Sequence, residues 1–193
     1  MLELDKAIKA HTEECGFQKS SGYIYKIENN YIYWVRCVID IDNNLNGEIL
    51  IKPIELNYVF WDIFGLHELK KKPKSFHVKA RFSAKFVSLT ELSFDLSNGV
   101  TKTYMKLLHA TSQFITKSML KLNSLHDFSE LIKFDDEHKL NYLLTLIYFN
   151  EYKTAYEIVS QAIGKREHGG FITADGQTVF EKIKLYCQCR LQA

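Results

Sequence analysis

The sequence predicts an α+β fold in which an N-terminal helix and an antiparallel sheet of four to five strands precede a helical region. The period of the apolar residues changes near Asn98: before it they alternate or form short β-branched and aromatic runs, and after it they recur every three to four residues. Strands and helices do not alternate regularly, which argues against a parallel sheet. We expect residues 1–97 to form the helix and sheet, and residues 98–193 to form helices packed on that sheet as one compact domain.

The first part of the chain contains a predicted helix and three predicted strands. Apolar residues in the first ten positions share one helical face, and Gly16 stands where a helix C-cap favours glycine. Tyrosine, isoleucine and valine then dominate, and Asn29-Asn30 is typical of a tight hairpin turn because asparagine tolerates positive φ. A second turn is predicted at residues 42–47. The resulting strands cover residues 23–28, 31–41 and 48–54.

Two further segments complete the predicted sheet region. Residues 57–66 form an apolar run that fits either a buried strand or a short helix ended by Gly65, and we favour a short helix or turn that packs Trp61 and Phe64 onto the sheet. Residues 76–89 alternate clearly and are predicted to form a strand solvated on one side. Its apolar face holds Phe76, Val78, Ala80, Phe82 and Ala84, and its polar face holds Lys79, Arg81, Ser83 and Lys85.

Helical periodicity dominates after the Asn98-Gly99 pair. One predicted helix begins at Asp135, because acidic residues in its first turn suit the helix dipole. Gly164 is expected to end another. The predicted helices cover residues 100–122, 125–134, a segment from Asp135 onward, 154–163 and 178–191.

The composition is that of an ordinary globular protein. The 193 residues are 46% hydrophobic and 25% charged, with a formal net charge of +2, which is far from the strongly basic domain typical of a dedicated nucleic-acid binder. The N-terminal residues carry charges throughout and lack the apolar stretch of a signal peptide, and the longest apolar run, 143–149, is too short to cross a bilayer. The four cysteines are irregularly spaced, which favours free thiols. We therefore expect a cytoplasmic protein without membrane contact.

Two groups of residues are candidate partner-binding sites. No acidic residue occurs from Lys70 to Lys85, and on the predicted strand Lys79, Arg81 and Lys85 would share a solvated face able to contact nucleic-acid phosphates. The alternative is that these lysines only protect an edge strand from aggregation. Tyrosines form the second group, because interfaces favour tyrosine, although the same residues suit cross-strand and core packing. They are Tyr23, Tyr25, Tyr31 and Tyr33.

Motifs for catalysis or metal binding are missing from the sequence. HExxH, GxSxG and P-loop patterns do not occur, and the seven histidines are dispersed. An EF-hand loop starting at Asp40 would need glycine and glutamate where Leu45 and Ile51 stand. Cys187 and Cys189 on one helix would point their thiols to different sides, which is unsuited to zinc. We predict no metal and no cofactor, we name no catalytic residue, and we favour a binding protein over an enzyme.

Features of the first third of the chain resemble small bacterial α+β domains of the immunity and phage-defence type. These features are the Gly16-Phe17-Gln18-Lys19 segment, the aromatic hairpin, Pro53, and the Phe60-Trp61-Asp62-Ile63 run. The resemblance implies a protein that binds another protein, with an immunity-type inhibitor as one form, and it implies no functional residue. Two alternatives stay open: a nucleic-acid-associated protein or nucleotide-acting enzyme that uses residues 70–85, and a homo-oligomer.

Overall fold

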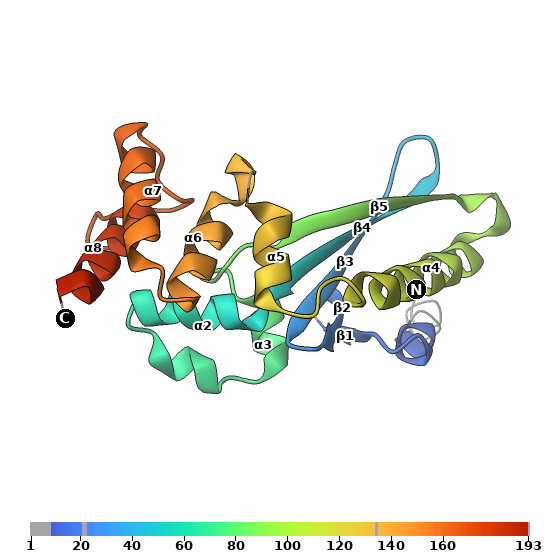
Figure 1. Ribbon diagram of the computed structural model, residues 1–193. Helices are drawn as coiled ribbons and strands as arrows, with labels where there is room; N and C mark the ends of the chain where they lie inside the picture. Colours follow the sequence, from blue (N-terminus) through green and yellow to red (C-terminus); the bar gives the residue numbers. More distant parts are fainter. Residues whose placement is uncertain (1–8, 21–22, 134, 193) are drawn as a thin grey trace. The chain divides into compact units, whose positions relative to one another are not determined.

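The computed structural model describes residues 9–20, 23–133 and 135–192, and it confirms the α+β class (Figure 1). The chain divides into two compact units that interleave along the sequence. The sheet unit comprises the described residues up to 53 together with 73–80 and 86–123. The helical unit comprises 54–72, 81–85 and the described residues from 124 onward.

Five antiparallel strands form the sheet, and each pairs with the next one in sequence (Figure 1). Asn29 and Asn30 have φ angles of 48° and 63°, which confirms the predicted two-residue turn, since a type I′ turn requires positive φ at both positions. The second turn lies earlier than predicted, at residues 40–43. The strands are β1 (Gln18–Ser20), β2 (Tyr23–Glu28), β3 (Tyr31–Ile39), β4 (Asn44–Pro53) and β5 (Val87–Asp95).

Helices pack on both faces of this sheet. The helix α4 (Val100–Met119) lies on the face that carries Gly47, where a Cβ atom would collide with the side chain of Leu107. Lys52 is five residues further along β4 and therefore points to the opposite face. There its Nζ atom donates to the carbonyl oxygen of His77, 3.1 Å away, in the short helix α3 (Lys74–Lys79). The sheet therefore has α4 on one face and α3 on the other. Both helices belong to the sheet unit.

The helical unit has its own core. Its first helix, α2 (Ile54–Ile63), begins directly after Pro53 and confirms the short helix that we favoured for the apolar run at 57–66. The other elements are η1 (His67–Lys71), α5 (Leu125–Ile132), η3 (Asp136–His138), α6 (Lys139–Tyr148), α7 (Tyr152–Gly164) and α8 (Val179–Gln192). Fully buried side chains include Phe60, Trp61, Phe128, Leu143, Val159 and Ile183.

The helices predicted at 100–122, 125–134, 154–163 and 178–191 are confirmed to within a few residues. The segment from Asp135 starts as the 3-10 turn η3, and α6 follows it. Of the predicted N-terminal helix, residues 9–14 are helical and Gly16 has a φ of 76°; residues 1–8 and residue 134 lie outside the described residues. Within the described ranges, we find no helix whose length and apolar character would allow it to cross a membrane.

The strand predicted at residues 76–89 is wrong. Residues 74–79 form α3, residues 80–86 are irregular, and β5 begins only at Val87. Side chains of the helical unit, rather than a neighbouring strand, bind the backbone of residues 81–85: the Trp61 indole N–H donates to the Phe82 carbonyl oxygen over 2.7 Å, and Asn141 bonds to Lys85. Alternation over nine residues cannot reveal such partners, because it records burial and not the hydrogen bonds of the backbone.

Candidate functional site

The basic residues of the 70–85 segment do not form one strand face. Lys79 lies at the end of α3 in the sheet unit, where its ammonium group donates to the Ser20 hydroxyl over 2.5 Å. Arg81 and Lys85 are exposed but belong to the irregular segment of the helical unit. Lys70 pairs with the Asp62 carboxylate, 2.5 Å away. The geometric basis for a shared phosphate-binding strand is therefore gone, because the strand itself is absent.

The four candidate tyrosines lie on opposite faces of the sheet. The two-residue turn places Tyr25 opposite Trp34 and Tyr33 opposite Lys26, so the tyrosines of β2 share a face with Trp34 and those of β3 occupy the other face. Tyr25, Tyr31 and Tyr33 are at most 4% exposed, and burial raises the pKa of Tyr33 to about 12. These three side chains build the core. Tyr23 is half-buried and its ring centroid lies 5.0 Å from that of Trp34.

The end of the β3–β4 hairpin exposes three large aliphatic side chains. Val38, Ile39 and Ile41 expose 55%, 52% and 99% of their surface. Because Val38 and Ile39 are consecutive in a strand, they point to opposite faces, so neither face of the hairpin is covered here. Figure 1 shows the loop between β3 and β4 standing clear of the sheet. We call Val38, Ile39 and Ile41 the hairpin tip.

Hydrogen bonds order the chain beneath the hairpin tip. The Asp40 carboxylate accepts from the Asn44 backbone N–H at 2.8 Å and from the Asn46 side-chain amide at 2.9 Å. These bonds hold the pKa of Asp40 below its ordinary value, since they stabilise its ionised form. Asn43 adopts a φ of 63°, and its carbonyl oxygen accepts from the Leu96 N–H. The three aliphatic side chains are thus presented by a preformed turn.

Sequence reasoning missed the hairpin tip, although a signal was present. Apolar residues continue from Cys37 to Ile41 directly into the polar turn, with only Asp40 between them. A hairpin end is normally solvated and polar. Three exposed aliphatic residues at such an end depart from this pattern.

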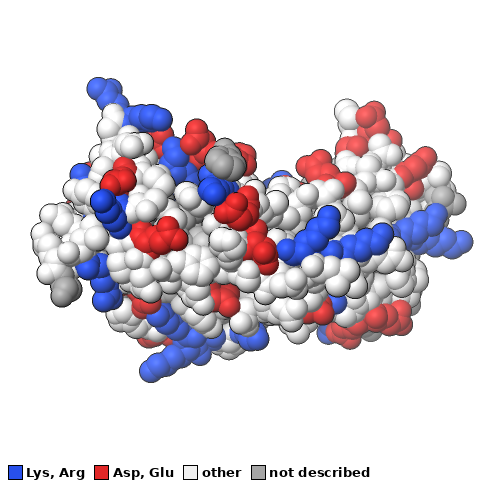
Figure 2. Space-filling view, in the orientation of Figure 1, with Lys and Arg blue, Asp and Glu red and all other residues white. Residues whose placement is uncertain are grey.

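A second surface is the exposed side of α4. Lys102, Lys106, His109, Gln113 and Lys117 are exposed and recur at helical spacing, so they share one side of the helix. The chain contains no acidic residue between Asp95 and Asp127. Figure 2 shows a row of basic side chains over this part of the sheet unit. This row spans roughly 22 Å along the helix, at 1.5 Å per residue.

One cysteine–histidine contact forms in the sheet unit. The Cys15 sulfur lies 3.9 Å from His109 Nδ1, but burial and the neighbouring Glu14 carboxylate raise the pKa of the Cys15 thiol. A thiol that titrates late is a poor nucleophile at neutral pH. Among the described residues, no group of three or more histidine, cysteine, aspartate or glutamate side chains is arranged to hold a metal ion.

No protein-family model, curated protein or solved structure matches this chain.

Proposed function

We propose that this protein acts by binding another protein and that the hairpin tip is its contact surface. The observation that carries this proposal is the exposure of Ile41, which is 99% accessible at the end of an ordered hairpin. The immunity-type inhibitor role rests on the sequence resemblance described above. The partner is expected to offer an apolar cleft, because all three tip residues are aliphatic.

Binding through the hairpin tip gains apolar burial and loses little conformational entropy. Fully burying an aliphatic side chain is worth about 1.5–3 kcal/mol. The Asp40 hydrogen bonds already order the turn in the free protein, so little conformational entropy is lost when the partner closes over it. A protruding hairpin is also convex, and it therefore suits insertion into a concave surface better than contact with a flat one.

The experiment compares Ile41→Asp with the wild type as bait in a nuclease-treated lysate of the cells from which the protein comes. Leu131→Asp is the matched control, since Leu131 of α5 is a 51% exposed leucine far from the hairpin in sequence. We expect a stoichiometric protein partner with the wild type and with Leu131→Asp. With Ile41→Asp we expect at least a tenfold loss of affinity for the purified partner, because the complex would then have to bury a carboxylate in place of an aliphatic group.

Thermal unfolding serves as the folding control, since substitutions at exposed positions usually change stability by less than about 0.5 kcal/mol. Retention of the partner by Ile41→Asp would contradict the proposed contact surface. Failure of the wild type to retain any protein above the level of the empty support would contradict the proposed function itself.

Nucleic-acid association is the second candidate function. The observation that favours it is the row of exposed basic side chains on α4, in a stretch of chain without acidic residues.

The test is fluorescence anisotropy with a labelled 20-base-pair DNA duplex at 50 and 200 mM salt. We expect the triple variant Lys102→Gln, Lys106→Gln, Lys117→Gln to bind at least tenfold more weakly than the wild type, with a smaller salt dependence. The matched control is Lys71→Gln, Lys72→Gln, Lys74→Gln. An equal loss with the control would show that binding depends on general charge and not on α4, and no binding at 50 mM salt would exclude this function.

A further inference from the structure

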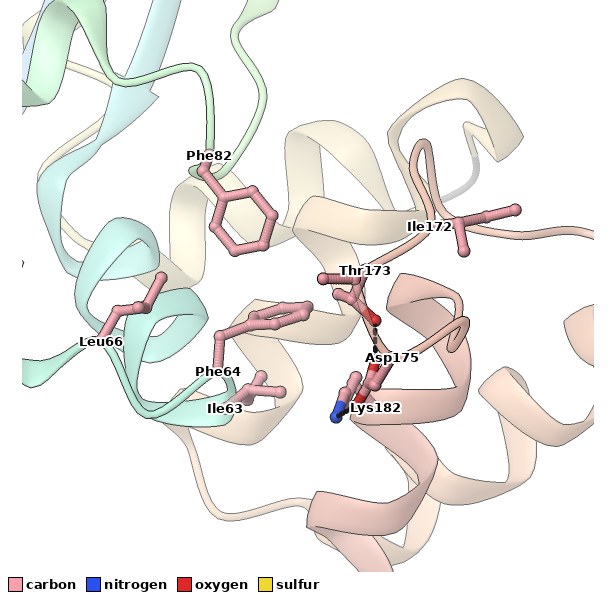
Figure 3. A pocket seen from close by; sticks show the side chains of 9 residues that line it. Ile63, Phe64, Leu66, Phe82, Ile172, Thr173, Asp175 and Lys182 are labelled. Carbon is pink, nitrogen blue, oxygen red and sulfur yellow. Dashed lines mark hydrogen bonds and ion pairs between the residues drawn. The ribbon is translucent and has the colours of Figure 1, made fainter.

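The helical unit contains a pocket that the proposed function does not use. Its volume is about 610 Å³, which lies within the range of small-molecule sites. Figure 3 shows the apolar side chains of Ile63, Phe64 and Phe82 on one side and the polar residues Asp175 and Lys182 on the other. All residues that line it belong to the helical unit.

Ring packing and hydrogen bonds form the apolar wall in advance. The Phe64 ring stands edge-on to that of Phe82, with centroids 5.0 Å apart, and it stacks on Phe60 at 4.6 Å. The Trp61 indole holds the Phe82 carbonyl oxygen at 2.7 Å. A ligand would therefore meet two aromatic surfaces that are already in place, and aromatic surfaces favour ring-bearing ligands.

A tight turn forms the polar wall. The Thr173 N–H donates to the Gln177 carbonyl oxygen at 2.8 Å, and the Thr173 hydroxyl donates to the Asp175 carboxylate. The Lys182 ammonium group reaches the other oxygen of Asp175, 2.5 Å away. The hydrogen bond from Lys182, followed by the weaker effect of the one from Thr173, lowers the pKa of Asp175 to about 2. Asp175 is therefore ionised at neutral pH, and the ion pair with Lys182 balances its charge.

The unused hydrogen-bonding capacity of this pair defines the ligand. An ammonium group has three N–H donors and each carboxylate oxygen accepts two bonds, so Lys182 keeps donors and Asp175 keeps an acceptor after they pair. A cationic ligand would meet Lys182, and an anionic one would meet Asp175, each with a repulsive contact. A head group that both donates and accepts while carrying no net charge satisfies both residues.

We propose that this pocket binds a small molecule with an aromatic body and a net-neutral head group that hydrogen-bonds to Asp175 and Lys182. The aromatic body lies against Phe64 and Phe82, and the head group faces the 173–177 turn. The proposal is independent of the hairpin tip, and either can fail without the other.

The experiment uses three probes that share one ring system and one chain length: 3-(2-naphthyl)propanamide, the matching propanoate and the matching propylamine. Binding is measured by amide chemical-shift titration of the full-length protein. We expect the neutral amide to bind at least fivefold more tightly than either charged probe. We also expect the largest shifts at residues 173–177.

Two substitutions are then expected to replace the preference for the neutral probe with opposite charge preferences. Lys182→Met leaves Asp175 as the charge at the pocket, so the amine is expected to become the tightest probe. Asp175→Asn leaves Lys182, so the propanoate is expected to become the tightest. Lys153→Met on the exposed side of α7 is the control and should keep the wild-type order.

A loss of folding would weaken all three probes together, whereas the proposal requires the order of the probes to change. Equal affinities of the three probes for the wild type would overturn the proposal. So would an unchanged order in both pocket variants, or shifts that fall outside the pocket.

Discussion

The side-chain amide of Asn141 makes two hydrogen bonds to the backbone of Lys85. Its oxygen accepts from the Lys85 N–H at 3.1 Å, and its nitrogen donates to the Lys85 carbonyl oxygen at 2.9 Å. Asn141 thereby does for this irregular segment what a neighbouring strand would do for a strand. It is 1% exposed, so water cannot readily replace it.

Asn141→Ala is therefore expected to destabilise the protein by about 2 kcal/mol, because it leaves a backbone donor and a backbone acceptor without partners in a partly buried place. Urea unfolding measures this change. Gln188→Ala, an exposed position of α8, is the control and should lie within about 0.5 kcal/mol of the wild type. A similar, small change for both variants would show that Asn141 does not hold the segment.

Gly47 provides a second test, in the sheet unit. A Cβ atom at this position would collide with the buried Leu107 side chain of α4, and overpacking of this kind costs about 1–3 kcal/mol. Gly47→Ala is expected to destabilise the protein by that amount in urea unfolding. In a Leu107→Ala background the same substitution should cost at least 1 kcal/mol less, because the truncated side chain leaves room. Additive effects would mean that the two residues do not meet.

Lys52 makes stability depend on pH. Burial lowers its pKa from 10.5 to about 7, so between these values the unfolded chain binds a proton that the folded chain does not. The free energy of unfolding therefore rises with pH across this window, by up to about 1.4 kcal/mol per pH unit. Below pH 7 the buried Lys52 is protonated and its whole destabilising effect is present. We expect Lys52→Met to be more stable than the wild type at pH 6–7 and to lose this advantage as the pH rises towards 10.

The measurement for Lys52 is urea unfolding of both proteins at several pH values, and taking the difference removes the pH dependence of all other groups. A difference that stays constant from pH 6 to 10 would contradict the assignment. The helix α3 is the reason to expect the effect, because it covers Lys52 on the face opposite α4 and removes the side chain from water.

The turn beneath the hairpin tip gives a residue-specific prediction. The Asn44 N–H donates to the Asp40 carboxylate, whose pKa lies below its ordinary value. Protection of the Asn44 amide from hydrogen exchange should therefore persist as the pH falls through the ordinary pKa of aspartate and decline only below it. Asp40→Ala should abolish this protection, whereas Asp42→Ala should preserve it. Equal protection in both variants would show that Asp40 does not order the turn.

Local features of the sequence were sufficient to predict most of the secondary structure. Asn29-Asn30 predicted a turn because two consecutive asparagines tolerate positive φ, and the apolar period after Asn98 predicted the later helices because a helix must bury one side. The strand predicted for residues 76–89 was wrong because residues 76–86 have no neighbouring strand to pair with. The tyrosines were recognised as a group, but the register that separates them onto two faces depends on where the turn places each strand.

The pocket of the helical unit depends on contacts between residues that are distant in the chain. Phe64, Phe82 and Lys182 line one pocket although they come from three separate segments, and no local pattern connects them. In the sequence Lys52 is indistinguishable from an exposed strand lysine, and only the packing of α3 buries it. Propensity and periodicity act over a few residues, so local sequence was enough to predict the α+β class, the Asn29-Asn30 turn and most helices. Burial, exposure and the meeting of side chains depend on packing between segments far apart in the chain, so they became visible only in the folded protein.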